Sequence, residues 1–182
     1  MRIRYNGHMI QAGQMAIRNY RPADILELHR IDQVCFDKDI AFSRVELLFY
    51  LNLPGSIAHV AVMDEQILGF VVGRLEPPLS AHILTLDVVP EARRHKIGTQ
   101  LMDVLHGEFQ KRGVATISLE VSTENEAARQ LYERLKYRRV GRLRGYYNGR
   151  TDAYRMVRIL RDEGVAGSTT PPLPDSPSAS SP

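Results

Sequence analysis

One stretch, Leu84–Leu105, changes its hydrophobic period in the middle, and this change constrains the fold more than any other feature. From Leu84 to Val88, every second residue is apolar, which is the period-two pattern of a β-strand. Pro90 ends this strand. After a basic turn, the 3.6-residue repeat of an amphipathic helix follows, with apolar residues at Ile97, Leu101, Met102, Leu105 and Phe109. The sequence therefore predicts a strand, a basic turn and a helix in succession.

The turn Arg93–Lys96 carries four basic residues at the point where the helix begins. A helix N-terminus offers unpaired N–H groups and the positive end of the macrodipole, so an anion can bind there. The turn matches neither the P-loop nor the GxGxxG pattern. It predicts a diphosphate site for a nucleotide carrier other than ATP or NAD. The alternative is an ordinary strand–helix connection with solvated charges.

Length and composition exclude several classes of protein. The chain has 182 residues, which is typical of one domain. Its single cysteine, Cys35, excludes an internal disulfide, and we expect it to pack as a small apolar group rather than act as a nucleophile. We expect no signal peptide or membrane span, and a cytoplasmic location. No histidine pair has metal-ligand spacing, so we predict no metal.

The remaining segments predict further elements. Ser43 and Glu46, and likewise Thr123 and Glu126, match the capping-box pattern at a helix start. In the helix after Thr123, Ala127, Leu131 and Leu135 are expected to face inward. Strands are predicted at 15–20, 57–63, 67–75, 84–88, 114–121, 138–144 and 151–160, and helices from Pro22 to Cys35, 43–53, 97–112 and 123–136. A helix joins the strands at 84–88 and 114–121, so these should be parallel.

The two ends of the chain differ from the rest. Residues 1–14 are polar and irregular, and we expect a flexible leader outside the core. Residues 163–182 are rich in proline and serine, which predicts a disordered tail. The domain itself should span residues 15–162. Within it, Arg134–Arg150 holds seven basic residues and no acid, which favours an anionic partner or, more simply, a solvated face.

The order of these elements resembles the GNAT superfamily of acyl-CoA-dependent N-acyltransferases. Two motifs, LEVSTENEAARQLYERLKY and GYYNGRTDAYRM, are similar to those of the ribosomal-protein-alanine N-acetyltransferase (RimI-like) group. The resemblance covers about residues 16–160. It implies a single α/β (α+β) domain. The sheet would be mixed and mostly antiparallel, with six to seven strands, a central parallel pair and about four helices.

The resemblance also implies roles for individual residues. Acetyl-CoA is the expected co-substrate, with its pantetheine arm on the backbone of Leu86, Asp87 and Val88. The pyrophosphate would lie on the turn Arg94, His95, Lys96, Ile97, Gly98 and Thr99, and Asn125 would contact the same cofactor. The implied general base is Glu120 and the implied general acid is Tyr132. Tyr146 and Tyr147 would lie on the substrate side.

Residue chemistry is compatible with these roles and leaves alternatives open. An α-amine has a pKa of about 7.7 to 8.0 and a lysine about 10.4, so a protein N-terminus is the easier nucleophile at neutral pH. A carboxylate with a pKa of about 4.3 is a weak base, so Glu120 would need burial or a relaying water. Glu120 could instead face solvent, while Tyr132 and the hairpin tyrosines could be packing residues only.

Two positions depart from the family pattern. Lys96 stands where the turn usually has its first glycine, and Lys136-Tyr137 stands where the last helix usually ends in Gly-Phe. If either site requires a left-handed backbone, lysine costs about 1 to 2 kcal/mol. We expect cofactor binding to be retained, because main-chain donors survive this change and Lys96 adds a cation.

The sequence thus predicts an N-acetyltransferase that uses acetyl-CoA to acetylate a protein N-terminus, with ribosomal proteins among the candidate acceptors. A lysine, polyamine or small-molecule acceptor is one alternative, and a non-catalytic acyl-CoA-binding module is another. No specific nucleic acid or membrane partner is expected, and the chain should be a monomer or a weak homodimer. The connection 36–43 and the Tyr146 hairpin should shape the acceptor slot.

Overall fold

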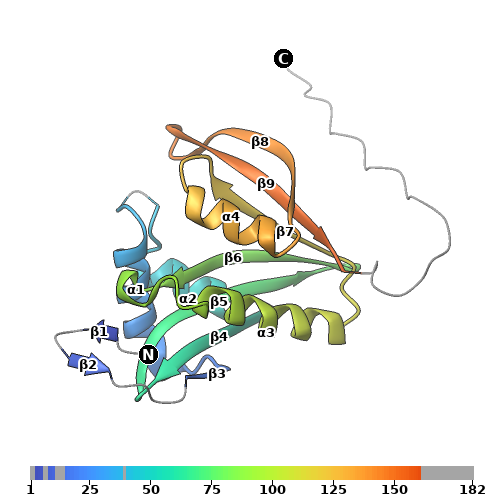
Figure 1. Ribbon diagram of the computed structural model, residues 1–182. Helices are drawn as coiled ribbons and strands as arrows, with labels where there is room; N and C mark the ends of the chain where they lie inside the picture. Colours follow the sequence, from blue (N-terminus) through green and yellow to red (C-terminus); the bar gives the residue numbers. More distant parts are fainter. Residues whose placement is uncertain (1–2, 6–7, 11–14, 39, 161–182) are drawn as a thin grey trace.

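The computed structural model describes residues 3–5, 8–10, 15–38 and 40–160, and its centre is one seven-stranded sheet (Figure 1). The strand order is β3-β4-β5-β6-β7-β9-β8. This is the mixed, mostly antiparallel sheet that the sequence predicts. The strands are β3 (Ala16–Asn19), β4 (Ser56–Met63), β5 (Gln66–Glu76), β6 (Ser80–Val88), β7 (Thr116–Ser122), β8 (Arg138–Tyr147) and β9 (Thr151–Ile159).

Strands β6 and β7 form the parallel pair, and α3 (Ile97–Lys111) crosses between them. Their pairing is short, because it runs only from Ser80 opposite Thr116 to His82 opposite Ser118. All other neighbours in the sheet are antiparallel. The predicted parallel crossover is therefore confirmed.

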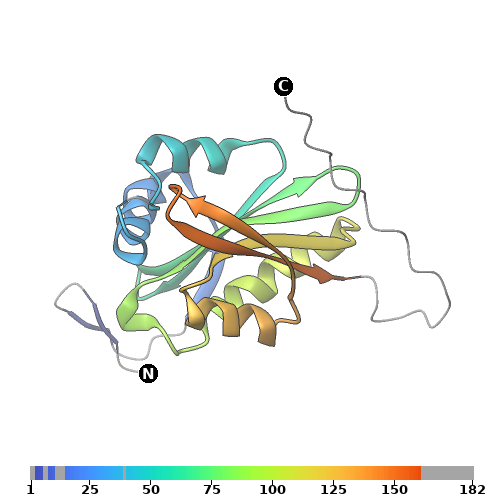
Figure 2. The same ribbon diagram turned by 90° about the horizontal axis from the view of Figure 1, so that it is seen from above.

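Helices cover both faces of the sheet (Figure 2). One face carries α1 (Ile25–Cys35) and α2 (Arg44–Asn52), and the other carries α3 and α4 (Glu126–Arg134). The apolar stripe of α3 is buried, as its periodicity predicts. Gly73 of β5 allows α3 to approach closely, because a Cβ there would lie 2.7 Å from Cζ of Phe109.

The two predicted capping boxes have different outcomes. Ser43 caps α2 as predicted, since its Oγ accepts the Glu46 N–H and Glu46 accepts the Ser43 N–H in return. The prediction for Thr123 is wrong. Its N–H donates to the Asp152 carbonyl of β9, which ties Thr123 to that strand just after the end of β7. The N-cap of α4 is Asn125, whose Oδ1 accepts the Ala128 N–H at 3.0 Å.

The residues of α4 that are buried also differ from those predicted. Ala127 is exposed, against the prediction, whereas Leu131 and Leu135 are half-buried. Tyr132 is the buried residue of the helix. The helix also ends at Arg134, two positions before the predicted Lys136.

Near the N-terminus, β1 (Ile3–Tyr5) and β2 (His8–Ile10) pair antiparallel, so part of the expected irregular leader is in fact paired. Short 3-10 helices occupy Pro22–Asp24 and Pro90–Ala92. The predicted disordered tail, 163–182, lies outside the described residues. The described helices include none that is long and apolar enough to cross a membrane.

Lys96 and Lys136, the positions where the resemblance implies glycine, both have left-handed backbones. The φ angle is +63° at Lys96 and +66° at Lys136. Lys96 precedes the first residue of α3, and Lys136 follows the C-cap of α4. The condition under which lysine is costly at these positions is therefore met at both.

Candidate active site

The site forms where β6 and β7 part. Beyond the pair His82–Ser118, no strand pairing continues between them among the described residues. A register shift between β5 and β6 leaves Leu84 without a partner on the other side as well. Backbone N–H and C=O groups are obligatory hydrogen-bonding groups. The inner edge of β6 after His82 is thus available to a ligand.

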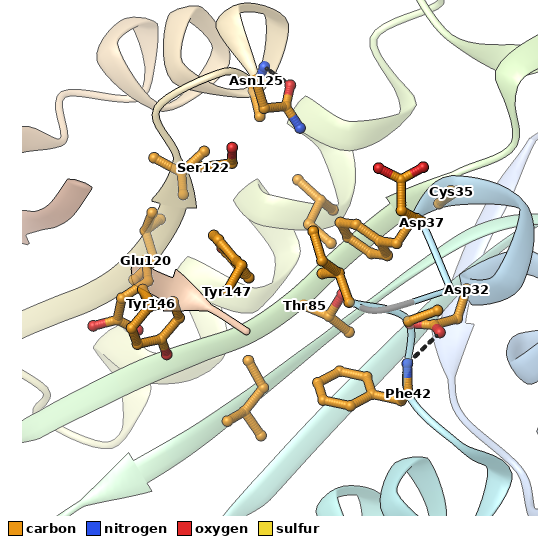
Figure 3. A pocket seen from close by; sticks show the side chains of 18 of the residues that line it. Asp32, Cys35, Asp37, Phe42, Thr85, Glu120, Ser122, Asn125, Tyr146 and Tyr147 are labelled. Atoms are coloured by element: carbon orange, nitrogen blue, oxygen red, sulfur yellow. Dashed lines mark hydrogen bonds between the residues drawn. The ribbon is translucent and has the colours of Figure 1, made fainter. Parts of the chain in front are cut away.

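A cavity of about 920 Å³ occupies this gap (Figure 3). Its walls come from the α1–α2 connection, the facing parts of β6 and β7, the start of α4 and the tip of the β8–β9 hairpin. The topology therefore brings together side chains that are far apart in the sequence. The sequence-predicted residues that line the cavity are Leu86, Glu120, Asn125, Tyr132, Tyr146 and Tyr147.

Glu120 is not a solvent-facing residue. Its side chain is only 6% exposed, and both carboxylate oxygens have partners. Oε2 lies 3.0 Å from Nε2 of His82 on β6. Oε1 accepts a hydrogen bond from Nε of Arg155 on β9 at 2.9 Å. The surface interpretation of Glu120 is therefore wrong.

Two opposing effects set the pKa of the Glu120 carboxyl. Burial raises the pKa, but the hydrogen bonds and charges of His82 and Arg155 lower it, and the net pKa lies below its ordinary value. A carboxylate with a low pKa is a poor terminal acceptor for an amine proton. Glu120 is better suited to stabilise a positive charge on its neighbour, His82.

His82 is the residue that sequence reasoning missed. It lines the cavity, and its Nδ1 lies 2.9 Å from Oγ of Ser118. Because Nε2 faces a carboxylate, the neutral ring carries its proton on Nε2, and Nδ1 accepts from the Ser118 hydroxyl. The predicted strand begins at Leu84, whereas β6 begins at Ser80. The signal for His82 is the parallel register, which only the tertiary structure supplies.

Tyr132 points into the cavity from α4 and is almost fully buried. Burial, together with the nearby Asp87 and Tyr147, raises the pKa of its hydroxyl well above the ordinary value. The group stays protonated at neutral pH. It can donate a hydrogen bond to a developing thiolate, but it does not readily give up its proton entirely.

Tyr146 and Tyr147 stand together at the tip of the β8–β9 hairpin. Their rings meet edge to face, with centroids 5.0 Å apart. Gly145, with φ of +58°, donates its N–H to Oδ1 of Asp152 at 2.7 Å, which fixes the approach to the tip. Burial raises the pKa of Tyr147 to about 12, so its hydroxyl remains a donor at neutral pH. Both side chains lie beside Glu120 in Figure 3.

The α1–α2 connection forms the opposite wall and is held by a buried aspartate. Oδ2 of Asp32 accepts the Phe42 N–H at 2.7 Å, whereas its buried Oδ1 has no hydrogen-bond partner. Burial raises the pKa of Asp32 to about 6. Phe42 in turn packs against Tyr50 of α2, with ring centroids 5.1 Å apart. This aromatic pair supports the wall of the cavity.

The strand residues assigned to the pantetheine arm differ in surroundings. Leu86 lines the cavity, and Leu86 and Val88 face the first turn of α3 at Gly98. Asp87 is buried on the other face, where it accepts from Thr85 Oγ1 at 2.8 Å and its pKa is raised by burial and by Asp32. The Val88 carbonyl accepts from Nε of Arg93 and from Sγ of Cys35.

Cys35 is thus a packing residue, and the pKa of its thiol is raised, chiefly by burial.

The basic turn lies beside the cavity and does not line it. Arg94, His95 and Lys96 are exposed, Ile97 is buried, and Gly98 and Thr99 are half-buried. A Cβ on Gly98 would approach Leu131 of α4 to 3.4 Å, so the first turn of α3 packs beside α4. The N-termini of α3 and α4 therefore flank one end of the cavity, and Asn125 lines that end.

The described part of the chain holds no cluster of three or more His, Cys, Asp or Glu side chains that is arranged to bind a metal ion. The polar groups that line the cavity include Glu120, His82 and the tyrosine hydroxyls, beside the open backbone edge of β6.

Comparison with known proteins gives consistent matches. The sequence profile of the acetyltransferase (GNAT) family matches residues 24–137. The N-alpha-acetyltransferase of Saccharolobus solfataricus is 29% identical over 156 residues, covering 79% of this chain and 92% of that protein. The [ribosomal protein bS18]-alanine N-acetyltransferase of Escherichia coli is 40% identical over 80 residues, which are 42% of this chain and 54% of that protein.

A solved structure shares the fold. Arabidopsis thaliana NAA60, crystallised in complex with acetyl-CoA, superposes with a TM-score of 0.71 over 81% of this chain and 99% of that chain, at 23% identity. The predicted resemblance to the ribosomal-protein-alanine N-acetyltransferase group is confirmed by these matches.

Proposed function

Because the chain belongs to the acetyltransferase (GNAT) family, we propose that it transfers the acetyl group of acetyl-CoA to the α-amine of a protein N-terminus. The observation that carries this proposal is the contact between His82 and Glu120 inside the cavity, beside the open edge of β6. The Saccharolobus relative, which is named an N-alpha-acetyltransferase, supports the choice of an α-amine. A cytoplasmic location is part of the same proposal.

The residues present fit acetyl-CoA. An extended amide chain such as pantetheine can pair with an unpaired strand edge as an added strand does, and β6 offers such an edge after His82. The N-terminus of α3, with Arg94, His95 and Lys96 beside it, suits a pyrophosphate. We assign the pantetheine arm to the backbone of residues 84–88 and the pyrophosphate to residues 94–99.

On the acceptor side, the first task of the enzyme is to remove a proton from an ammonium group. We propose that Nδ1 of His82, the ring nitrogen that carries no proton, accepts this proton by way of the Ser118 hydroxyl that it faces. The ionised Glu120 stabilises the imidazolium that forms. The Ser118 hydroxyl donates to Nδ1 of the neutral ring and can rotate to accept from the protonated one. Glu120 and His82 therefore act as a unit in this step.

The free amine then attacks the thioester carbonyl carbon directly. A C–N bond forms and the C–S bond breaks, so the electron pair of that bond leaves with the CoA sulfur. The nitrogen loses its second proton to solvent, and the thiolate takes up a proton from solvent. His82 then gives its proton to solvent, so one proton is released in each transfer. Tyr132 donates a hydrogen bond to the departing sulfur, and Tyr146 and Tyr147 hold the acceptor peptide. No covalent enzyme intermediate is involved.

The proposal is tested with labelled acetyl-CoA and a library of peptides that vary in their first residue. Peptides with the N-terminus of ribosomal proteins come first, because the Escherichia coli relative is named for an alanine of bS18. Mass spectrometry should place the acetyl group on Nα. If the label were found only on lysine Nε or on small amines, the acceptor would be one of these and not a protein N-terminus. If acetyl-CoA bound but no acetyl group were transferred, the chain would be a non-catalytic acyl-CoA-binding module.

Tyr132 is tested separately. Tyr132→Phe should lower kcat about tenfold or more, because it removes one hydrogen bond that forms only as the thiolate leaves. The Kd of acetyl-CoA should not change. Tyr154→Phe, on the neighbouring β9, is the matched control. A wild-type kcat in Tyr132→Phe would remove the assigned role.

A further inference from the structure

We propose that Arg155 is a positioning residue for the Glu120–His82 pair: it holds the carboxylate so that one oxygen faces His82, and it sets the pH at which the pair takes up a proton. Only the expected effect of Arg155 on the rate of acetyl transfer rests on the proposed function. Its structural basis is a contact that no residue motif in the sequence indicates.

The geometry places Arg155 directly across from Glu120. The two residues face each other in the antiparallel register of β7 and β9, and such pairs have neighbouring Cβ atoms. Nε of Arg155 donates to Oε1 of Glu120 at 2.9 Å. This leaves Oε2 for Nε2 of His82 at 3.0 Å. The carboxylate is thus held from both sides, one oxygen to each partner.

The two partners of Glu120 differ in accessibility. The Arg155 side chain is 52% exposed, whereas the Glu120 side chain is 6% exposed. A guanidinium that remains hydrated loses little solvation free energy, yet its charge keeps a buried carboxylate ionised. Without Arg155, burial would favour protonated Glu120. A protonated carboxyl no longer stabilises an imidazolium at His82.

Other groups around the pair do not take over this role. The pKa values of Tyr146 and Tyr147 of β8 are raised, so their hydroxyls are neutral, and the Tyr146 hydroxyl hydrogen-bonds Glu120 without adding a charge. Arg74 of β5, opposite His82 in register, is ion-paired with Glu76. Within the described residues, the ion pairs of Glu120 are those with His82 and Arg155. Arg155 is therefore the permanent cation that contacts this carboxylate.

The experiment compares Arg155→Met, Arg155→Lys and a matched control, Arg142→Met. Arg142 lies on β8, and its side chain is 60% exposed and paired with Asp152. The first readout is the NMR titration of the His82 ring in the free protein. In Arg155→Met, the apparent pKa of the pair should rise by about one unit, since an adjacent opposite charge shifts a carboxyl by about that much or more. In Arg155→Lys the apparent pKa should stay close to the wild-type value, and in Arg142→Met it should not change.

The second readout is the pH profile of acetyl transfer. In Arg155→Met the acid limb of kcat/KM should move to higher pH by the same amount, with kcat lowered about tenfold at neutral pH and KM for acetyl-CoA unchanged. An unchanged titration and an unchanged profile in a folded Arg155→Met protein would overturn the inference. If wild-type protein transfers no acetyl group, the proposed function fails, while the NMR titration still decides the role of Arg155.

Discussion

Nε2 of His82 lies 3.0 Å from Oε2 of Glu120, across the point where two parallel strands cease to pair. The contact exists because β6 and β7 are in register only up to His82 and Ser118, so that Glu120 projects into the gap that opens after them. A protonable ring and a carboxylate thus meet at the only stretch of β6 whose inner edge, within the described residues, lacks a strand partner.

The contact predicts that the two residues act as a unit. Glu120→Gln and His82→Gln should each lower kcat by about 10² to 10⁴, the usual contribution of general acid–base catalysis. The double variant should be little slower than either single one, because the second change removes an interaction that is already lost. Single-turnover kinetics measure the rates, and calorimetry should show unchanged acetyl-CoA affinity.

His29→Gln, on α1, is the matched control and should keep wild-type turnover. Fully additive losses in the double variant would show that His82 and Glu120 act independently. A wild-type rate in His82→Gln alone would return the role of base to Glu120, acting through water.

Much of the fold follows from local pattern. The period change at Leu84–Leu105 predicts β6, the turn and α3, and the crossover rule then gives the parallel pair. Glu120 and Tyr132 could be assigned from their motif, although not their burial. The partners of Glu120 could not be predicted from the sequence, because His82 and Arg155 reach it through the register of neighbouring strands. The N-cap of α4 does not follow from the local sequence, because the Asp152 carbonyl on β9 accepts the Thr123 N–H that a capping box would use.

The left-handed lysines predict a gain in stability on substitution. Lys96→Gly and Lys136→Gly should each raise the free energy of unfolding by about 1 kcal/mol, because glycine adopts φ of about +60° without the Cβ clash. Thermal unfolding should show the two gains to be additive. Lys111→Gly, at the end of α3, is the control and should lower stability by up to about 1 kcal/mol. Destabilisation by Lys136→Gly would mean that the lysine side chain outweighs the backbone effect.

The buried carboxyl of Asp32 predicts a dependence of stability on pH. Its pKa is raised from 3.8 to about 6, chiefly by burial. A raised pKa means that its contribution to stability is fully present below about pH 4 and is lost as the pH rises through 6. As the pH rises from 4 to 8, the free energy of unfolding of Asp32→Asn should therefore increase relative to that of wild type by up to about 3 kcal/mol.

Urea unfolding of both proteins across this range measures the difference. Asp37→Asn, in the same connection but exposed, is the matched control for removing a carboxylate there. If the difference in free energy of unfolding between Asp32→Asn and wild type stayed constant with pH, the pKa of Asp32 would be the same in the folded and the unfolded protein.

We propose above that the cavity beside β6 supports acetyl transfer from acetyl-CoA to a peptide α-amine. The most direct measurement incubates the full chain with labelled acetyl-CoA and one peptide in two forms, with a free and with a blocked N-terminus, each containing an internal lysine. We expect label on Nα of the free form, none on the blocked form, and loss of labelling in Glu120→Gln. Equal labelling of both forms would contradict it.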